Sequence, residues 1–170
     1  MADLFVLTAD KNMQYAIAGG IARHHALGTA GFSVEYDVHI GRDGGVRTTG
    51  VDMLKLQSST HAKLLLVMDF DGCGTDHLSA LDLERDLDSR LDAVIGGRRA
   101  KAIVVAPECD CWIWGSDNSM SSIVGWERDT SIRDWIRSRG FQVHEHGNPS
   151  RPTQAIEELF RLKRIHRSPS

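Results

Sequence analysis

Two aspartates follow the most apolar segment of the chain, and their spacing points to chemistry. In LLLVMDFDGCGTD, residues 64–76, Asp69 and Asp71 stand two positions apart, directly after a run of apolar residues. Carboxylates held close together repel one another unless a cation lies between them, and Mg²⁺ and Mn²⁺ prefer carboxylate oxygens as ligands. The pair therefore predicts a divalent-metal site with Asp69 and Asp71 among its ligands.

Two further acids follow other strand-like segments. Asp10 comes shortly after the apolar residues 4–7, and Glu108 ends the segment KAIVVAPE. If these segments are parallel strands, their carboxyl ends meet at the same edge of one sheet as Asp69. We expect Glu108 to be a third metal ligand and Asp10 to be an extra ligand of the same ion. The alternative for Asp10 is a helix cap, a common role for an acid after a strand.

Strands and helices alternate over the first two thirds of the chain. Residues 63–70 contain the continuous apolar run 64–68, and residues 101–106 contain the apolar run 102–106. Such runs are typical of strands covered on both faces. Residues 32–40 alternate instead, as expected near a sheet edge. The glycine-rich segment GRDGGVRTTG, residues 41–50, predicts a turn, with a short helix only from 51 to 57. Helical spacing of apolar residues over 13–21 and 78–95 predicts two longer helices.

This alternation indicates an α/β fold, with a mostly parallel, Rossmann-like sheet and helices on both faces. The later part of the chain is helix-rich. There we expect a short helix or turn over 111–114, helices within 131–140 and 152–165, and a last strand over 141–146. We predict one domain over residues 1–170, with a core over about 1–110 and an α-rich C-terminal cap over about 111–170.

Composition limits the classes of protein that remain. The 170 residues are 41% hydrophobic and 25% charged with a net charge of −3, so overall charge alone does not indicate a nucleic-acid-binding protein. The opening MADLFVLTADKNM lacks a basic segment and a long apolar segment, so we expect no signal peptide, and no membrane span is predicted. With three cysteines, an odd number, we expect a soluble, cytoplasmic protein with reduced thiols.

The order of the segments and the DxD pair resemble the Toprim-like domain family, especially the small stand-alone members of bacterial defence systems. The family's DxD acids match Asp69 and Asp71, and APECDCWIWG resembles a Pro-Glu-x-x-x-Trp-like setting with Glu108 and Trp112. The first strand departs from the family pattern. Toprim domains normally end that strand with Glu and Gly, and the Glu is the expected general base, whereas VLTADKNM offers only Asp10 as a general base or extra ligand.

The resemblance implies a Mg²⁺- or Mn²⁺-dependent nuclease in which Asp69, Asp71 and Glu108 hold the metal. It also implies a nucleic-acid substrate, DNA or RNA, and a partner ATPase, and self-association into a homo-oligomer stays open. Phosphate contacts are expected from Arg42, Arg47, Arg151 or the basic tail Arg161, Lys163, Arg164 and Arg167, although a solvated helix face explains the tail equally well.

Two alternatives remain at this stage. The first is a non-catalytic Toprim-like binding or regulatory subunit that lost the first acid of the family. The second is a phosphatase resembling the haloacid dehalogenase family, whose DxDG motif matches DFDG, with Asp69 as nucleophile and Asp71 as acid or base. The later acids and the Lys of that family have no match here, and its motif usually opens the chain.

Overall fold

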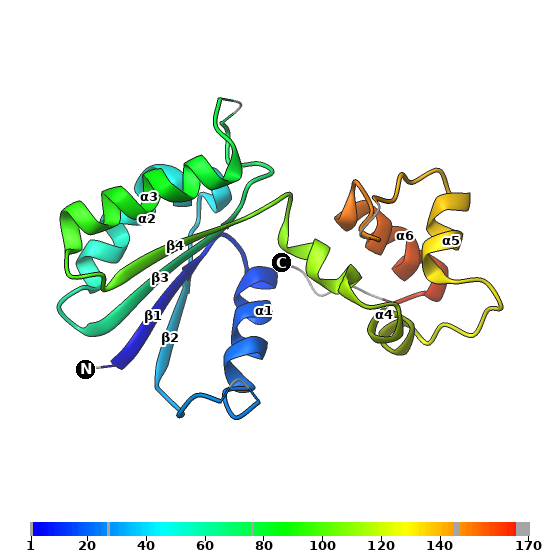
Figure 1. The fold of residues 1–170 in the computed structure, drawn as a ribbon, viewed down its shortest axis with the longest axis horizontal. Helices are drawn as coiled ribbons and strands as arrows, with labels where there is room; N and C mark the ends of the chain where they lie inside the picture. Colours follow the sequence, from blue (N-terminus) through cyan, green and yellow to red (C-terminus); the bar gives the residue numbers. More distant parts are fainter. Residues whose placement is uncertain (1, 27, 76, 145–146, 166–170) are drawn as a thin grey trace. The chain divides into compact units, whose positions relative to one another are not determined.

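The computed structural model describes residues 2–26, 28–75, 77–144 and 147–165 (Figure 1). Internal contacts divide the chain into two compact units, which we call unit 1, ending at Cys109, and unit 2, beginning at Asp110. The division falls close to the predicted boundary between core and cap near residue 110. That both parts form one functional domain stays a prediction.

Unit 1 is built on a four-stranded sheet in which every strand pair is parallel. The strand order is β2-β1-β3-β4. The strands are β1 (Ala2–Thr8), β2 (Val34–Val38), β3 (His61–Asp69) and β4 (Ala100–Val105). The predicted α/β class is confirmed, and β2, which has the alternating pattern, is an edge strand as expected.

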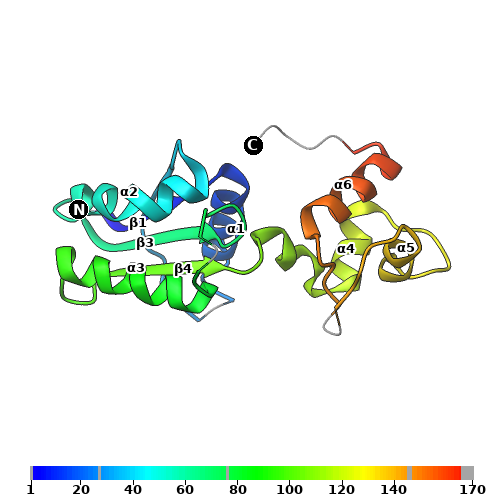
Figure 2. The same cartoon turned by 90° about the horizontal axis from the view of Figure 1, so that it is seen from above.

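Three helices cover the two faces of this sheet. Helix α1 (Lys11–Ala22) packs on β1 and β2 from one face, whereas α2 (Arg42–Gln57) and α3 (Ala80–Ile95) pack on β3 and β4 from the other (Figure 1). Apolar residues at helical spacing explain the packing of α3, because Leu83, Leu87 and Leu91 are all buried. Seen from above, α2 and α3 lie side by side (Figure 2).

The predicted turn over residues 41–50 is wrong, because α2 begins at Arg42 and includes the whole glycine-rich segment. Its glycines serve close packing instead of turning the chain. A Cβ at Gly45 would lie 2.4 Å from His39 Cε1, and one at Gly50 would lie 2.8 Å from Leu66 Cδ1. A side chain at either position would therefore force a neighbouring side chain outside the helix to shift.

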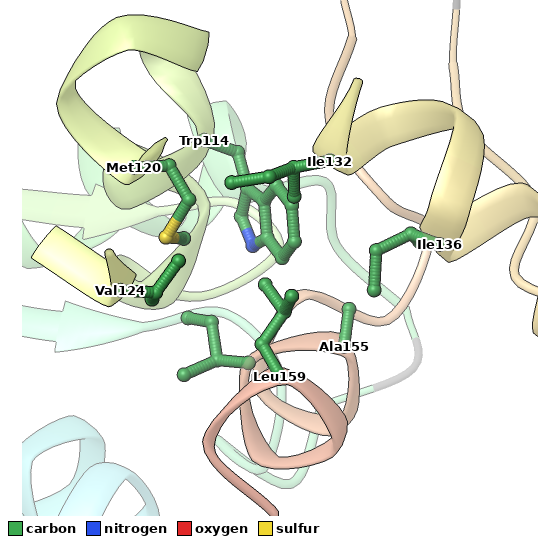
Figure 3. Packing of buried hydrophobic residues seen from close by; sticks show 8 residues of the cluster. Trp114, Met120, Val124, Ile132, Ile136, Ala155 and Leu159 are labelled. Carbon is green, nitrogen blue, oxygen red and sulfur yellow. The ribbon is translucent and has the colours of Figure 1, made fainter. Parts of the chain in front are cut away.

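Unit 2 is helical, as predicted for the cap. It contains most of η1 (Cys109–Gly115), then α4 (Asp117–Val124), α5 (Ile132–Ser138) and α6 (Pro152–Lys163). The indole of Trp114 lies at the centre of its core (Figure 3). Around it pack side chains from all three α-helices: Met120, Val124, Ile132, Ile136, Ala155, Ile156 and Leu159.

The predicted last strand, residues 141–146, is wrong for the part that the structure describes. Over 141–144 only an isolated antiparallel bridge between Val143 and Pro149 is formed, and residues 145 and 146 lie outside the described residues. Alternation of apolar and polar residues cannot supply a neighbouring strand, and without one the backbone forms no ladder. Within the described ranges, no helix is long and apolar enough to cross a membrane.

Candidate functional site

The connections between strands pass to opposite faces of the sheet on either side of its two central strands, β1 and β3. Helix α1 leaves β1 toward one face, whereas α2 and α3 lie on the other, so the crossover connections diverge between β1 and β3. In open parallel sheets, a crevice forms at the carboxyl ends of the strands where the connections diverge in this way. Asp10 follows β1 at this position and Asp69 ends β3. The two acids are therefore at the place where such folds bind ligands.

Asp69 is fixed on both its backbone and its side chain. Its carboxylate Oδ1 accepts a hydrogen bond from the backbone N–H of Cys109 at 2.7 Å, which connects the end of β3 to the segment after β4. Its own backbone N–H donates to Oδ1 of Asp43 at 2.8 Å. Three segments distant in sequence therefore meet at this residue.

The electrostatics of Asp69 differ strongly from those of an ordinary aspartate. The pKa of Asp69 is raised to about 8. Burial is the largest cause, and the negative charges of Asp43, Asp10 and Glu108 act in the same direction. The hydrogen bond from the Cys109 N–H acts in the opposite direction. We call Asp10, Asp43, Asp69 and Glu108 the carboxylate cluster. Their negative charge needs a proton or a cation to offset it.

Asp43 is the member of the cluster that the sequence analysis missed. It lies in the first turn of α2, where burial and the charge of Asp10 raise its pKa, while backbone hydrogen bonds and the charge of Arg42 lower it. A signal was present, because Asp43 follows β2 just as Asp10 follows β1. The prediction of a turn over 41–50 hid it, since a residue in a long turn has no fixed direction.

Asp10 caps a helix, which is the alternative role that the sequence analysis gave it. It is the N-cap residue of α1, and its Oδ1 accepts a hydrogen bond from the backbone N–H of Met13 at 2.9 Å. Its charge nevertheless acts on both Asp69 and Asp43, so it belongs to the cluster as well. The cap engages Oδ1 of the carboxylate.

Asp71 differs from the other predicted site residues. It lies in the turn after β3, its side chain is exposed, and its backbone N–H donates to the carbonyl of Pro107 at 2.9 Å. The described charges that raise the pKa of Asp69 are those of Asp43, Asp10 and Glu108, not that of Asp71. The structure thus gathers Asp69, Asp10 and Glu108 and leaves Asp71 outside the cluster.

The donor chemistry of the cluster fits a hard divalent cation, because every side chain in it offers carboxylate oxygen. In the side-chain positions seen, no group of three or more His, Cys, Asp or Glu among the described residues is arranged to hold a metal ion. The metal site stays a prediction.

The arginines expected to meet phosphate have different surroundings. Arg42 is exposed at the start of α2, close to Asp43. Arg47 Nε donates to the carbonyl of Cys73 at 2.7 Å and so supports the loop after Asp71. In unit 2, Arg151 lies over the ring of Phe141, and Arg161 pairs with Glu158 at 2.5 Å.

Comparisons with models of protein families, with curated proteins and with solved structures found no match. The fold and the site geometry by themselves define the class of protein. It is an α/β protein with an all-parallel, Rossmann-like sheet and a cluster of acids at the carboxyl edge of that sheet.

Proposed function

We propose that the chain is a divalent-metal-dependent nuclease that hydrolyses phosphodiester bonds at the carboxylate cluster. The observation that carries the proposal is the convergence of Asp10, Asp43 and Glu108 on the half-buried Asp69 at the point where the sheet's connections diverge. Burying like charges together is costly, and a fold keeps such an arrangement most readily where a cation uses it.

In this proposal, Asp69 and Glu108 bind Mg²⁺ or Mn²⁺ through carboxylate oxygen, and rotation of Asp71 toward the cluster supplies a third ligand. The bound ion would supply a Lewis acid for a phosphate oxygen and a water of lowered pKa. Asp43 holds the backbone N–H of Asp69, which fixes the position of that carboxylate. Asp10 is the general base or an extra ligand.

The partners follow from the same proposal. Nucleic acid is the substrate, and a partner ATPase in a defence complex is proposed from the resemblance to stand-alone Toprim-like proteins. Cytoplasmic localisation and the Toprim-like assignment itself are proposals of the same kind.

The test combines metal binding with cleavage. Mn²⁺ and Mg²⁺ are titrated calorimetrically into the wild-type protein and into Asp69→Asn, Glu108→Gln and Asp71→Asn, with Asp52→Asn, an exposed position in the middle of α2, as the matched control. Labelled single-stranded and duplex DNA and RNA are then incubated with each protein. We expect binding and cleavage in the wild type and the control, and loss of both in Asp69→Asn. Metal-independent cleavage, or cleavage that survives in Asp69→Asn, would contradict the proposal.

The second candidate function is a non-catalytic binding or regulatory module of the same fold. It is favoured by the engagement of Asp10 in a helix cap and by the absence, among the described residues, of a preformed metal-ligand group. Metal binding without any cleavage, with or without a partner ATPase, supports this alternative. A phosphoryl group trapped on Asp69 after incubation with a phosphate ester would instead support the phosphatase.

A further inference from the structure

Residues 39–43, which comprise the connection after β2 and the first two residues of α2, are held by several contacts at the same edge of the sheet as the cluster. We call these five residues the β2–α2 loop. His39 is only 7% exposed, and its backbone N–H donates to the carbonyl of Thr8 at 2.9 Å. Its ring Nδ1 accepts from the N–H of Gly41 at 2.9 Å, and Nε2 lies 2.8 Å from Thr49 Oγ1. Since the Thr49 hydroxyl donates to the carbonyl of Gly45, these contacts assign the tautomer with the proton on Nε2.

Close packing leaves this loop little freedom to move. Cβ atoms at Gly41 and Gly45 would come within 3.2 and 2.4 Å of the His39 ring, so both backbones lie directly against it. Arg42 has a φ of 50°, a left-handed conformation that is costly for a residue with a side chain. A non-glycine residue in this region is held by its surroundings, and such strain is frequent at ligand-binding positions.

The rigid loop presents two side chains to solvent. Ile40 is 99% exposed, the largest exposed fraction among the large hydrophobic side chains described. A single exposed apolar residue is ordinary, but an isoleucine at the tip of an anchored loop, three residues before a cluster carboxylate, is preorganised for contact. Arg42 is exposed too, and its charge reaches Asp43. A cation therefore adjoins the cluster, and a fully exposed apolar side chain precedes that cation by two residues in the chain.

We propose that the β2–α2 loop binds single-stranded nucleic acid. In this proposal Arg42 contacts a phosphate beside the cluster, and Ile40 packs against the face of an unstacked base. The inference rests on the proposal that this edge meets nucleic acid. A cation next to a group of acids is suited to a phosphate that the acids bind through a metal ion. An apolar side chain reaches the face of a base only where that base is not stacked in a duplex, which selects single strands.

The experiment measures binding separately from cleavage. Fluorescence anisotropy of short labelled single strands, and of the matching duplex, is followed in Ca²⁺ at several salt concentrations. The variants are Ile40→Ser and Arg42→Gln. Their matched controls are Leu56→Ser, which is 77% exposed, and Lys55→Gln, both in the last turns of α2, about 20 Å away along the helix. Thermal unfolding confirms that each variant is folded.

We expect Ile40→Ser to weaken single-strand binding about fivefold to tenfold with little change for duplex. Arg42→Gln should weaken both, and should reduce the slope of log K against log salt by about 0.7 for single strands. Equal affinities for Ile40→Ser and Leu56→Ser, an equal loss on duplex, or no binding by the wild type would overturn the inference. Binding that fits these expectations without any cleavage would contradict the nuclease and leave the loop's role supported.

Discussion

The carboxylate of Asp43 accepts a hydrogen bond from the backbone N–H of Asp69 at 2.8 Å, joining the first turn of α2 to the end of β3. The bond brings two acids together although their charges repel one another, and each pKa is raised mainly by burial. It also explains why the end of the central strand has a fixed direction at the edge where the site is proposed.

Two substitutions of Asp43 separate its hydrogen bond from its charge. Asp43→Asn keeps an oxygen acceptor and removes the charge, whereas Asp43→Ala leaves the Asp69 N–H without this partner. We expect the alanine variant to be less stable than the asparagine variant by about 1–2 kcal/mol in urea unfolding. Both should lower the pKa of Asp69, as followed by NMR of its carboxyl carbon, because Asp43 is among the charges that raise it. Equal stabilities would show that the hydrogen bond contributes nothing.

Stability without divalent metal should fall as the pH rises. The pKa of Asp69 is about 8 in the folded protein and about 3.9 in an unfolded chain, so between these values the folded state holds a proton that the unfolded state has lost. This contribution is fully present below about pH 4 and is lost as the pH rises through about 8.

Asp69→Asn carries no charge and should therefore be more stable than the wild type at about pH 9, and similar to it at about pH 4. With a discount for solvent screening, we expect a difference of about 2–3 kcal/mol at the higher pH, measured by urea unfolding in a metal chelator. Asp52→Asn, on the exposed side of α2, should show no such dependence. A wild type that is equally stable across this range would rule out the raised pKa.

The glycines of α2 provide a test of the corrected helix boundary. Helix propensity alone predicts that alanine stabilises each of them by about 1 kcal/mol. At Gly44 a Cβ would meet nothing nearer than 3.9 Å, so we expect this gain there. At Gly45 and Gly50 the neighbours at 2.4 and 2.8 Å must shift, so we expect losses of about 1–3 kcal/mol. Thermal unfolding of the three variants gives the order, and stabilisation at Gly45 would contradict the packing against His39.

The edge strand β4 is protected by carboxylates of α3. The N–H of Val104 donates to Glu84 Oε2 at 3.0 Å and the N–H of Ala102 donates to Asp88 Oδ1 at 2.8 Å. These donors would otherwise be open to pairing with another chain. Replacing both acids by alanine should lower stability by about 2 kcal/mol and promote self-association in size-exclusion chromatography. Asp86→Ala, on the exposed side of the same helix, is the control, and it should have the stability and the elution volume of the wild type.

By itself, the sequence determined the alternation of strands and helices, and with it the acids that follow the strands. Continuous apolar runs mark β3 and β4, and parallel strands must bring their carboxyl ends to one edge, so Asp69, Asp10 and Glu108 could be placed together beforehand. These features depend on local periodicity and on the handedness of strand connections, and both can be read from residue types along the chain.

Only the tertiary structure decided which acids complete the cluster. Gly45 and Gly50 suggested a turn. In the structure they give room to the side chains of His39 and Leu66, and no local sequence pattern indicates that these side chains are close. The helix they allow fixes Asp43 beside Asp69, whereas the turn after β3 directs Asp71 into solvent. Spacing in the sequence sets which residues share an edge, but the direction of each side chain depends on close packing between segments distant in the chain.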